Sequence, residues 1–220
     1  MAKRVKGNGL MPVFYNDDLL FIHIPKCGGC SVTNAARKGL PGFIEPGVKR
    51  KHHKPGVPIG HIRAVDFEHF TGRPLNTFKR IFATTRDPVA TEWSKWNFWR
   101  MRYFQDGEFV SWRHPADQFA WDRTFDEFVS SGIDPFNEWY CNEIVEDAKP
   151  DYNDVGRFNW WLTEQVETVR IEDVEKINKI LRSHGCETKV GHDNRTGVGP
   201  VIHTRETIET IRGYYEGVAA

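Results

Sequence analysis

The sequence lacks an excess of charge of either sign and lacks any long hydrophobic run. Its 220 residues carry 30 Lys and Arg against 30 Asp and Glu, and this balance argues against a nucleic-acid binder with a broad positive surface. No segment approaches the roughly 18 apolar residues of a membrane span, and no apolar stretch of a secretory signal follows the basic N-terminus. We therefore predict a cytoplasmic protein with no nucleic-acid partner and no stable membrane insertion, in which any anion site is local.

Cysteine is also scarce. The four cysteines stand at positions 27, 30, 141 and 186, which is too few for a disulfide scaffold and leaves out the second close pair that a zinc site needs. This pattern predicts a reducing compartment and no metal centre. A chain of this length with 39% hydrophobic residues has enough apolar surface for one large core, so we predict a single domain over residues 1–220.

Hydrophobic periodicity predicts strands that alternate with helices. The predicted strands cover residues 19–24, 78–85 and 165–171. The predicted helices cover residues 31–38, 64–70, 88–103, 124–131, 136–144 and 173–183, followed by a last helix after residue 204. Buried strands joined through helices are typical of βαβ units, so the predicted fold class is α/β, a mostly parallel sheet flanked by helices in three layers. Ser31 and Thr204 are predicted to cap the first and the last helix.

The junction after the first predicted strand has the composition of an anion-binding loop. Residues 25–31 read PKCGGCS and stand directly before a predicted helix N-terminus, whose N–H groups attract anions. The paired glycines let the backbone approach an oxyanion, Lys26 adds a full charge, and Ser31 adds a hydroxyl. Because the lysine precedes the glycines, the string G-x-x-x-x-G-K-[ST] is absent, and an ordinary nucleoside-triphosphatase or kinase is disfavoured.

A second polar junction follows the second predicted strand. Arg86 stands directly after that strand, where its guanidinium can grip a phosphate through two hydrogen bonds, and Ser94 stands about two turns into the next helix. An ion pair of Arg86 with Asp87 or Glu92 is the purely structural alternative. Both junctions lie at the carboxyl ends of predicted parallel strands, which is where α/β proteins bind ligands.

These two motifs resemble those of sulfotransferases that use 3′-phosphoadenosine-5′-phosphosulfate (PAPS). Residues 25–31 are similar to the family's PK-[TC]-G-G-[TS]-S loop, and residues 86–94, RDPVATEWS, are similar to its R-[DN]-P-x-x-R-x-x-S segment. A weaker likeness continues over residues 125–129, 170–173 and 204–215. The resemblance implies a phosphate-loop NTPase-like sulfotransferase fold of the carbohydrate-type or bacterial branch.

The resemblance also implies which residues bind the donor. The 5′-phosphosulfate of PAPS would contact Lys26, Cys27, Gly28, Gly29, Cys30 and Ser31, and its 3′-phosphate would contact Arg86 and Ser94. Cys30 stands where threonine is commoner in the family. Because a thiol is a poor hydrogen-bond donor, backbone N–H groups would carry one of the phosphate contacts alone.

The segment GHIRA, residues 60–64, looks like the family's G-H-x-x-A segment and implies His61 as the general base, a role suited to a group with a pKa near neutrality. Glu45, His52 and His53 are the alternatives. The implied reaction moves a sulfuryl group from PAPS to a hydroxyl or amine of an acceptor, a carbohydrate among the candidates. Lys26 would stabilise the leaving oxygen, and 3′,5′-adenosine bisphosphate (PAP) would be released.

Two other functions stay open at this point. Cys27 and Cys30 at a helix N-terminus are also what a thiol-disulfide oxidoreductase presents, and the same anion loop would suit a non-catalytic adenine-nucleotide-binding protein. Trp93, Trp96 and Trp99 recur every three residues and predict either an aromatic helix face buried against the sheet or, for one of them, a stacking platform for adenine or a sugar ring. The basic run over residues 49–54 is predicted to be solvated.

Overall fold

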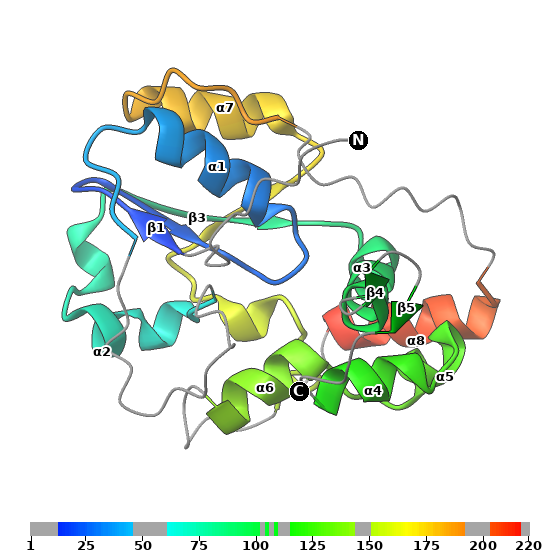
Figure 1. Cartoon of the computed structure of the whole chain (residues 1–220). Helices are drawn as coiled ribbons and strands as arrows, with labels where there is room; N and C mark the ends of the chain where they lie inside the picture. Colours follow the sequence, from blue (N-terminus) through cyan, green and yellow to red (C-terminus); the bar gives the residue numbers. More distant parts are fainter. Residues whose placement is uncertain are drawn as a thin grey trace. The chain divides into compact units, whose positions relative to one another are not determined.

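The computed structural model describes residues 13–45, 61–101, 104–105, 108–109, 115–143, 151–191 and 203–216 (Figure 1). The chain divides into two compact units. The sheet unit spans Met1–Thr85 and Trp161–Asn194, and the helical unit spans Arg86–Trp160 and Arg195–Ala220. The basic run over residues 49–54, with His52 and His53, lies outside the described residues.

The sheet unit contains a four-stranded sheet. Its strands are β1 (Phe14–Tyr15), β2 (Leu19–Ile22), β3 (Arg80–Thr85) and β6 (Glu167–Arg170), in the spatial order β1-β2-β3-β6. β1 pairs with β2 in antiparallel orientation, whereas the β2–β3 and β3–β6 pairs are parallel. The predicted α/β class with a mostly parallel sheet is therefore confirmed.

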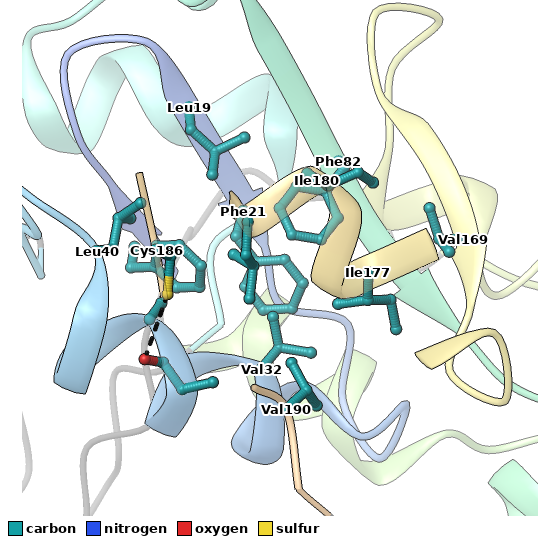
Figure 2. Close-up of a cluster of buried hydrophobic side chains, with 14 residues drawn as sticks. Leu19, Phe21, Val32, Leu40, Phe82, Val169, Ile177, Ile180, Cys186 and Val190 are labelled. Carbon is teal, nitrogen blue, oxygen red and sulfur yellow. Dashed lines mark hydrogen bonds between the residues drawn. The ribbon is translucent and has the colours of Figure 1, made fainter. Parts of the chain in front are cut away.

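Two helices cover one face of this sheet, namely α1 (Gly29–Gly39) and α7 (Val174–Ser183) (Figure 1). Their apolar faces pack on the alternate strand residues Phe21 and Phe82. Figure 2 shows this core, in which the thiol of Cys186 donates a hydrogen bond to the backbone oxygen of Ala35 on α1 at 3.7 Å. Cys186 is thus a core residue that ties the segment after α7 to α1.

The opposite face of the sheet carries α2 (Phe67–Thr71), preceded by the 3₁₀ helix η1 (Ala64–Asp66) and followed by η2 (Leu75–Thr77). The rings of Tyr15, Phe67 and Phe78 pack edge to face here, with centroids 5.6–5.8 Å apart. Strand alternation explains why Phe14 enters the α1–α7 core while its neighbour Tyr15 faces α2.

The helical unit begins with α3 (Pro88–Met101), whose first residue is the proline that suits a first helical turn. Its other elements are β4 (Phe104–Gln105), β5 (Glu108–Phe109), α4 (Pro115–Trp121), α5 (Phe125–Ser130), α6 (Pro135–Glu143) and α8 (Arg205–Glu216). The 3₁₀ helix η3 (Asn159–Trp161) lies where the chain returns to the sheet unit. β4 and β5 pair in antiparallel orientation.

Aromatic residues form the core of the helical unit. Trp96 and Trp99 are buried among side chains of α4, α5, α6 and α8, and half-buried Trp93 packs against this cluster. The prediction that the tryptophan face packs on the sheet was therefore wrong, because helices of its own unit cover it. Trp93 contacts the rings of Phe125 and His203 at 5.0 and 5.4 Å.

The same unit also buries a charge cluster formed by Glu92, Lys95, Asp134, Arg157 and Tyr215. The Lys95 ammonium donates to Glu92, Asp134 and the Tyr215 hydroxyl at 2.6–3.0 Å, and Arg157 lies 2.9 Å from the second Glu92 oxygen. Burial raises the pKa of Glu92, but Arg157 and Lys95 outweigh burial and lower it to about 2. Two buried carboxylates thus face two buried cations, which is the arrangement that makes burying charge tolerable.

Element boundaries differ from the predictions in instructive places. β2 ends at Ile22 rather than at residue 24, because its pairing with β3 ends at the Ile22–Ala83 pair. The first helix begins at Gly29, with Gly28 as its N-cap, so the prediction of Ser31 as the cap was wrong. Thr204 caps the last helix as predicted, accepting a hydrogen bond from the Thr207 N–H at 3.1 Å. The sequence over residues 106–123 predicts a loop that contacts the acceptor, and the structure shows the helix α4 inside this stretch.

Candidate functional site

The turn between β2 and α1 has an unusual backbone. Lys26 adopts a φ of +62°, the sole positive φ of a non-glycine residue within the described ranges, and Gly28 follows at +77°. A lysine in this region is strained, and such strain persists where the surrounding structure imposes it, often at functional sites. An alternation of left-handed and ordinary conformations is typical of anion-binding nests; in this turn the N–H groups of Cys27 and Ser31 donate to the backbone oxygens of Ile24 and Gly28 at 3.4 and 3.1 Å.

Both glycines of the turn are required by their surroundings. A Cβ on Gly28 would lie 2.4 Å from the Ile171 side chain, and its positive φ would strain any other residue. Gly29 has an ordinary φ, yet a Cβ there would lie 2.1 Å from Cδ2 and 2.3 Å from Nε2 of His23. The GG pair therefore lets α1 begin directly on top of the sheet.

The first turn of α1 has the properties of an anion-binding helix end. Gly28 caps the helix without any side-chain hydrogen bond, and the first turn contains no acidic residue. Lys26 and Cys30 are partly exposed, whereas Cys27 and Ser31 are buried. The helix dipole and the N–H groups of this turn thus favour a bound oxyanion, with the Lys26 charge next to them.

His61 lies beside this turn. Its Nδ1 is 2.8 Å from the backbone oxygen of His23, which fixes Nδ1 as the protonated nitrogen in the neutral ring and leaves Nε2 as the acceptor. The His61 ring is 4.5 Å from the His23 ring and 6.0 Å from the Trp161 ring. The pKa of His61 is lowered to about 4, chiefly because the ring is buried; the hydrogen bond to His23 opposes this, and the nearby charge of Lys26 adds to the lowering.

The structure thus brings together Lys26 and His61, which are 35 positions apart in the chain. It does not give His61 the near-neutral pKa that the sequence led us to expect, because the ring lies in a desolvated place near a cation. Glu45, the alternative base, accepts hydrogen bonds from Arg37 on α1. That pairing holds the carboxylate as the partner of a cation and disfavours it as a base.

Thr84 adds a buried polar atom to the same end of the sheet. Its side chain is fully buried, and its hydroxyl has no hydrogen-bond partner among the described residues. Thr84 follows the last β2–β3 pair, and strand alternation places it on the same face as Phe82, the face that α1 and α7 cover. An unsatisfied buried hydroxyl costs free energy, so its presence here is a feature that a bound group or water would relieve.

Arg86 and Ser94 belong to the helical unit. Arg86 is partly buried and, within the part of the chain that the structure describes, makes neither an ion pair nor a side-chain hydrogen bond. Ser94 on α3 is only 5% exposed, and its hydroxyl likewise makes no hydrogen bond to described residues. Both side chains therefore retain the hydrogen-bonding capacity that a phosphate would use.

The structural alternative for Arg86 is contradicted. The carboxylate of Glu92 is taken by Lys95 and Arg157. That of Asp87 accepts a hydrogen bond from the Ala90 N–H at 2.8 Å, inside the first turn of α3. Neither predicted acidic partner pairs with Arg86, so neither neutralises its guanidinium.

Sequence reasoning missed His23 and Thr84. His23 stands inside the string FIHIPK, where a polar residue interrupts a buried apolar run, and that interruption is the signal that marks it. Thr84 carries no such signal, because threonine is an ordinary strand residue.

Comparison of the chain with family models, with curated proteins and with solved structures found no match in any of the three. Among the described residues, no cluster of three or more His, Cys, Asp and Glu side chains could hold a metal ion. None of the described helices is both long enough and apolar enough to span a membrane. The site's chemistry therefore has to be inferred from its own residues.

Proposed function

We propose that the protein is a PAPS-dependent sulfotransferase with the phosphate-loop type of α/β fold. The observation that carries this proposal is the turn between β2 and α1, in which strained Lys26 and the left-handed N-cap Gly28 precede a helix N-terminus without a side-chain cap. The guanidinium of Arg86, which pairs with no described residue, supports it independently. The sequence resemblance supplies the identity of the anion, since it matches both motifs to those of one donor substrate.

In this proposal PAPS is the donor substrate. The backbone of Gly28, Gly29 and Cys30, with Lys26 and Ser31, binds the 5′-phosphosulfate. The sequence resemblance assigns the 3′-phosphate, the group that distinguishes this donor from ATP, to Arg86 and Ser94. Cys27 is fully buried, and its N–H donates to the Ile24 backbone oxygen at 3.4 Å, so it supports the turn from within rather than binding the anion.

The reaction is an in-line transfer. The acceptor oxygen or nitrogen forms a bond to sulfur, the bond from sulfur to the oxygen of the 5′-phosphate breaks, and PAP leaves with that electron pair. Lys26 stabilises the charge that develops on the leaving oxygen, and its loss would cost on the order of 3 kcal/mol of transition-state stabilisation. The proton of the acceptor passes to Nε2 of His61, the nitrogen that the bond to His23 leaves as an acceptor.

The low pKa of His61 has a definite consequence for this mechanism. At neutral pH the ring is unprotonated and competent to accept a proton, but with a pKa of about 4 it is a weak base. The negative charge of a phosphosulfate bound beside Lys26 would raise the pKa of His61, because it offsets the lysine's positive field. His61 would thus become a stronger base only when the donor is bound.

Binding of PAP tests the donor assignment. Isothermal calorimetry of the full chain should show PAP binding, with ATP binding at least about 10-fold weaker. Lys26→Ala and Arg86→Ala should each weaken PAP binding, while Lys79→Ala and Arg205→Ala serve as matched controls, since both are exposed cations whose only role is a surface ion pair. Equal PAP affinity in Lys26→Ala, Arg86→Ala and the two controls would refute the assignment.

Transfer itself is tested with radiolabelled PAPS over acceptor classes, beginning with carbohydrates. His61→Ala should abolish transfer while PAP binding persists. Binding of PAP without transfer to any acceptor would instead favour the adenine-nucleotide-binding protein.

Cys27 and Cys30, which are reduced in the structure, keep the oxidoreductase as a second candidate. Heat-denaturation scans separate the two, because a ligand that binds only the folded state raises the midpoint. A midpoint that responds to dithiothreitol and not to PAP would favour thiol chemistry.

A further inference from the structure

His23 contacts two parts of the candidate site in the sheet unit, Gly29 and His61. It directly follows β2, and its side chain is only 2% exposed. Strand alternation places it on the face of Phe21, whose ring centroid is 5.9 Å away. That is the face on which α1 packs, so the imidazole lies beneath the beginning of α1.

The His23 ring occupies the space that a side chain at position 29 would need. The position that a Cβ on residue 29 would occupy lies 2.1–2.7 Å from three atoms of the ring, which is far inside van der Waals contact. Since Gly29 has an ordinary φ, this ring is the specific obstacle to a side chain there. The backbone of the first turn of α1 therefore rests on the imidazole.

The same residue holds His61. Its carbonyl oxygen accepts the 2.8 Å hydrogen bond from Nδ1 of His61, and its ring lies 4.5 Å from the His61 ring with planes at 57°. The carbonyl fixes the tautomer of His61, and the ring limits the directions in which His61 can turn. One residue thus contacts both the anion-binding turn and the proposed base.

We propose that His23 is a positioning residue for sulfuryl transfer, which aligns the first turn of α1 and His61 with each other by contacting both. This inference rests on the proposed function for its catalytic meaning. Its physical content is that the distance between the bound anion and Nε2 of His61 is set by one rigid ring under Gly29. A shift of about 1 Å in such an alignment can cost roughly 100-fold in rate.

A substitution cycle between residues 23 and 29 tests this contact. Gly29→Ala should weaken PAP binding by about 10-fold or more, because the new methyl group displaces the turn. Adding His23→Ala should restore most of that affinity, since it removes the obstacle. The matched control is Gly28→Ala, which His23→Ala should not rescue, because residue 28 also needs a positive φ and contacts Ile171 instead.

The contact to His61 is tested without donor or activity. The titration of the His61 imidazole, followed by NMR and assigned by its loss in His61→Ala, should move up by about one pH unit in His23→Ala, because water reaches the ring. His23→Phe retains a ring of similar size and should keep both the low titration point and most of the PAP affinity. A residue that only stabilised the fold would lower the melting temperature and leave the His61 titration unchanged.

The two failures are distinguishable. If the unsubstituted chain binds no PAP, the proposed function fails. The Gly29→Ala and His23→Ala variants are then compared by their free energies of unfolding, and His23→Ala by the His61 titration. If the His61 titration is the same in His23→Ala as in the unsubstituted chain, or if His23→Ala fails to rescue Gly29→Ala, the positioning role of His23 is refuted whatever the protein binds.

Discussion

The helical unit buries a cluster of paired charges, whereas the α1–α7 core of the sheet unit is apolar. In the helical unit, Glu92, Lys95, Asp134 and Arg157 are almost fully buried and satisfy one another. In the sheet unit, the α1–α7 core is apolar, and the buried polar residues His23 and Thr84 gather near the carboxyl ends of the strands. Paired charge inside a core can fix one arrangement, whereas the carboxyl ends of parallel strands are where α/β proteins bind ligands, so the difference agrees with the proposed function.

The contrast also holds within the helix α3. Glu92 and Lys95 are locked into the buried charge cluster, whereas Ser94 between them and Arg86 before the helix have no partners among described residues. The paired residues anchor the helix, and the partnerless ones are held at defined positions by that anchor. We infer that the charge cluster fixes the position of α3; a binding role for Arg86 and Ser94 belongs to the proposed function.

The largest effect should come from breaking the buried charge cluster. Glu92→Ala leaves Arg157 and Lys95 buried without their shared carboxylate and should destabilise the fold by roughly 3–5 kcal/mol. Urea unfolding measures this. Glu209→Ala, which removes the exposed partner of Arg205, should change stability by less than about 1 kcal/mol. Similar losses in the two variants would contradict the distinction between the cluster and the surface.

Arg86→Ala should change PAP affinity and leave stability nearly unchanged. Because Arg86 has no described partner to lose, its removal should leave the unfolding free energy within about 0.5 kcal/mol of the unsubstituted chain. PAP affinity should nonetheless fall by a factor of about 10–100, the value of a charge-assisted hydrogen-bond pair. A large loss of stability in this variant would mean that Arg86 is structural.

The pH dependence of stability should report on His61. Its pKa is about 4 in the folded chain and 6.5 by reference, so the unfolded state takes up the proton first. The contribution of neutral His61 to the free energy of unfolding is therefore fully present above about pH 6.5 and is lost as the pH falls toward 4. Because the residue as a whole is only half-buried, solvent screening reduces the expected loss of unfolding free energy to about 1–2 kcal/mol. Urea unfolding between pH 4 and 7 should show a flatter curve for His61→Gln.

Thr84→Val should give the smallest effect on the fold. It replaces an unsatisfied buried hydroxyl by a methyl group and should leave stability unchanged or raise it by up to about 1 kcal/mol. If the hydroxyl serves the bound anion or its water, PAP affinity should fall in the same variant. Loss of stability together with unchanged affinity would show that the hydroxyl has a structural partner.

Local signals were sufficient for most of the elements. The apolar run at β2, the proline at the start of α3 and the Thr204 cap predicted their elements to within a few residues, because each signal acts over one or two turns. The cap of α1 was misplaced, since a left-handed glycine has no side chain to reveal it. The loop prediction over residues 106–123 failed because the short helix α4 is stabilised by tertiary packing on Trp96 and Trp99, which no local sequence pattern records.

The candidate site was predictable only in part. The residue types of the turn after β2 indicate anion binding by themselves, and so does an arginine after a strand. Whether that arginine pairs internally depends on where Lys95 and Arg157 lie around Glu92, which no local pattern records. The pairing of His61 with His23, and with it the low pKa, likewise needs the two segments to meet.

By itself, then, the amino-acid order determined the strands, the helices, the glycine turn and the supply of groups able to hold an anion, since these follow from backbone preference and side-chain chemistry over a few neighbouring residues. Only the tertiary structure decided which charges neutralise one another, which cation is left over, and how strongly His61 holds a proton. Those properties depend on burial and on distances between residues remote in the chain, and both come into existence only when the chain folds.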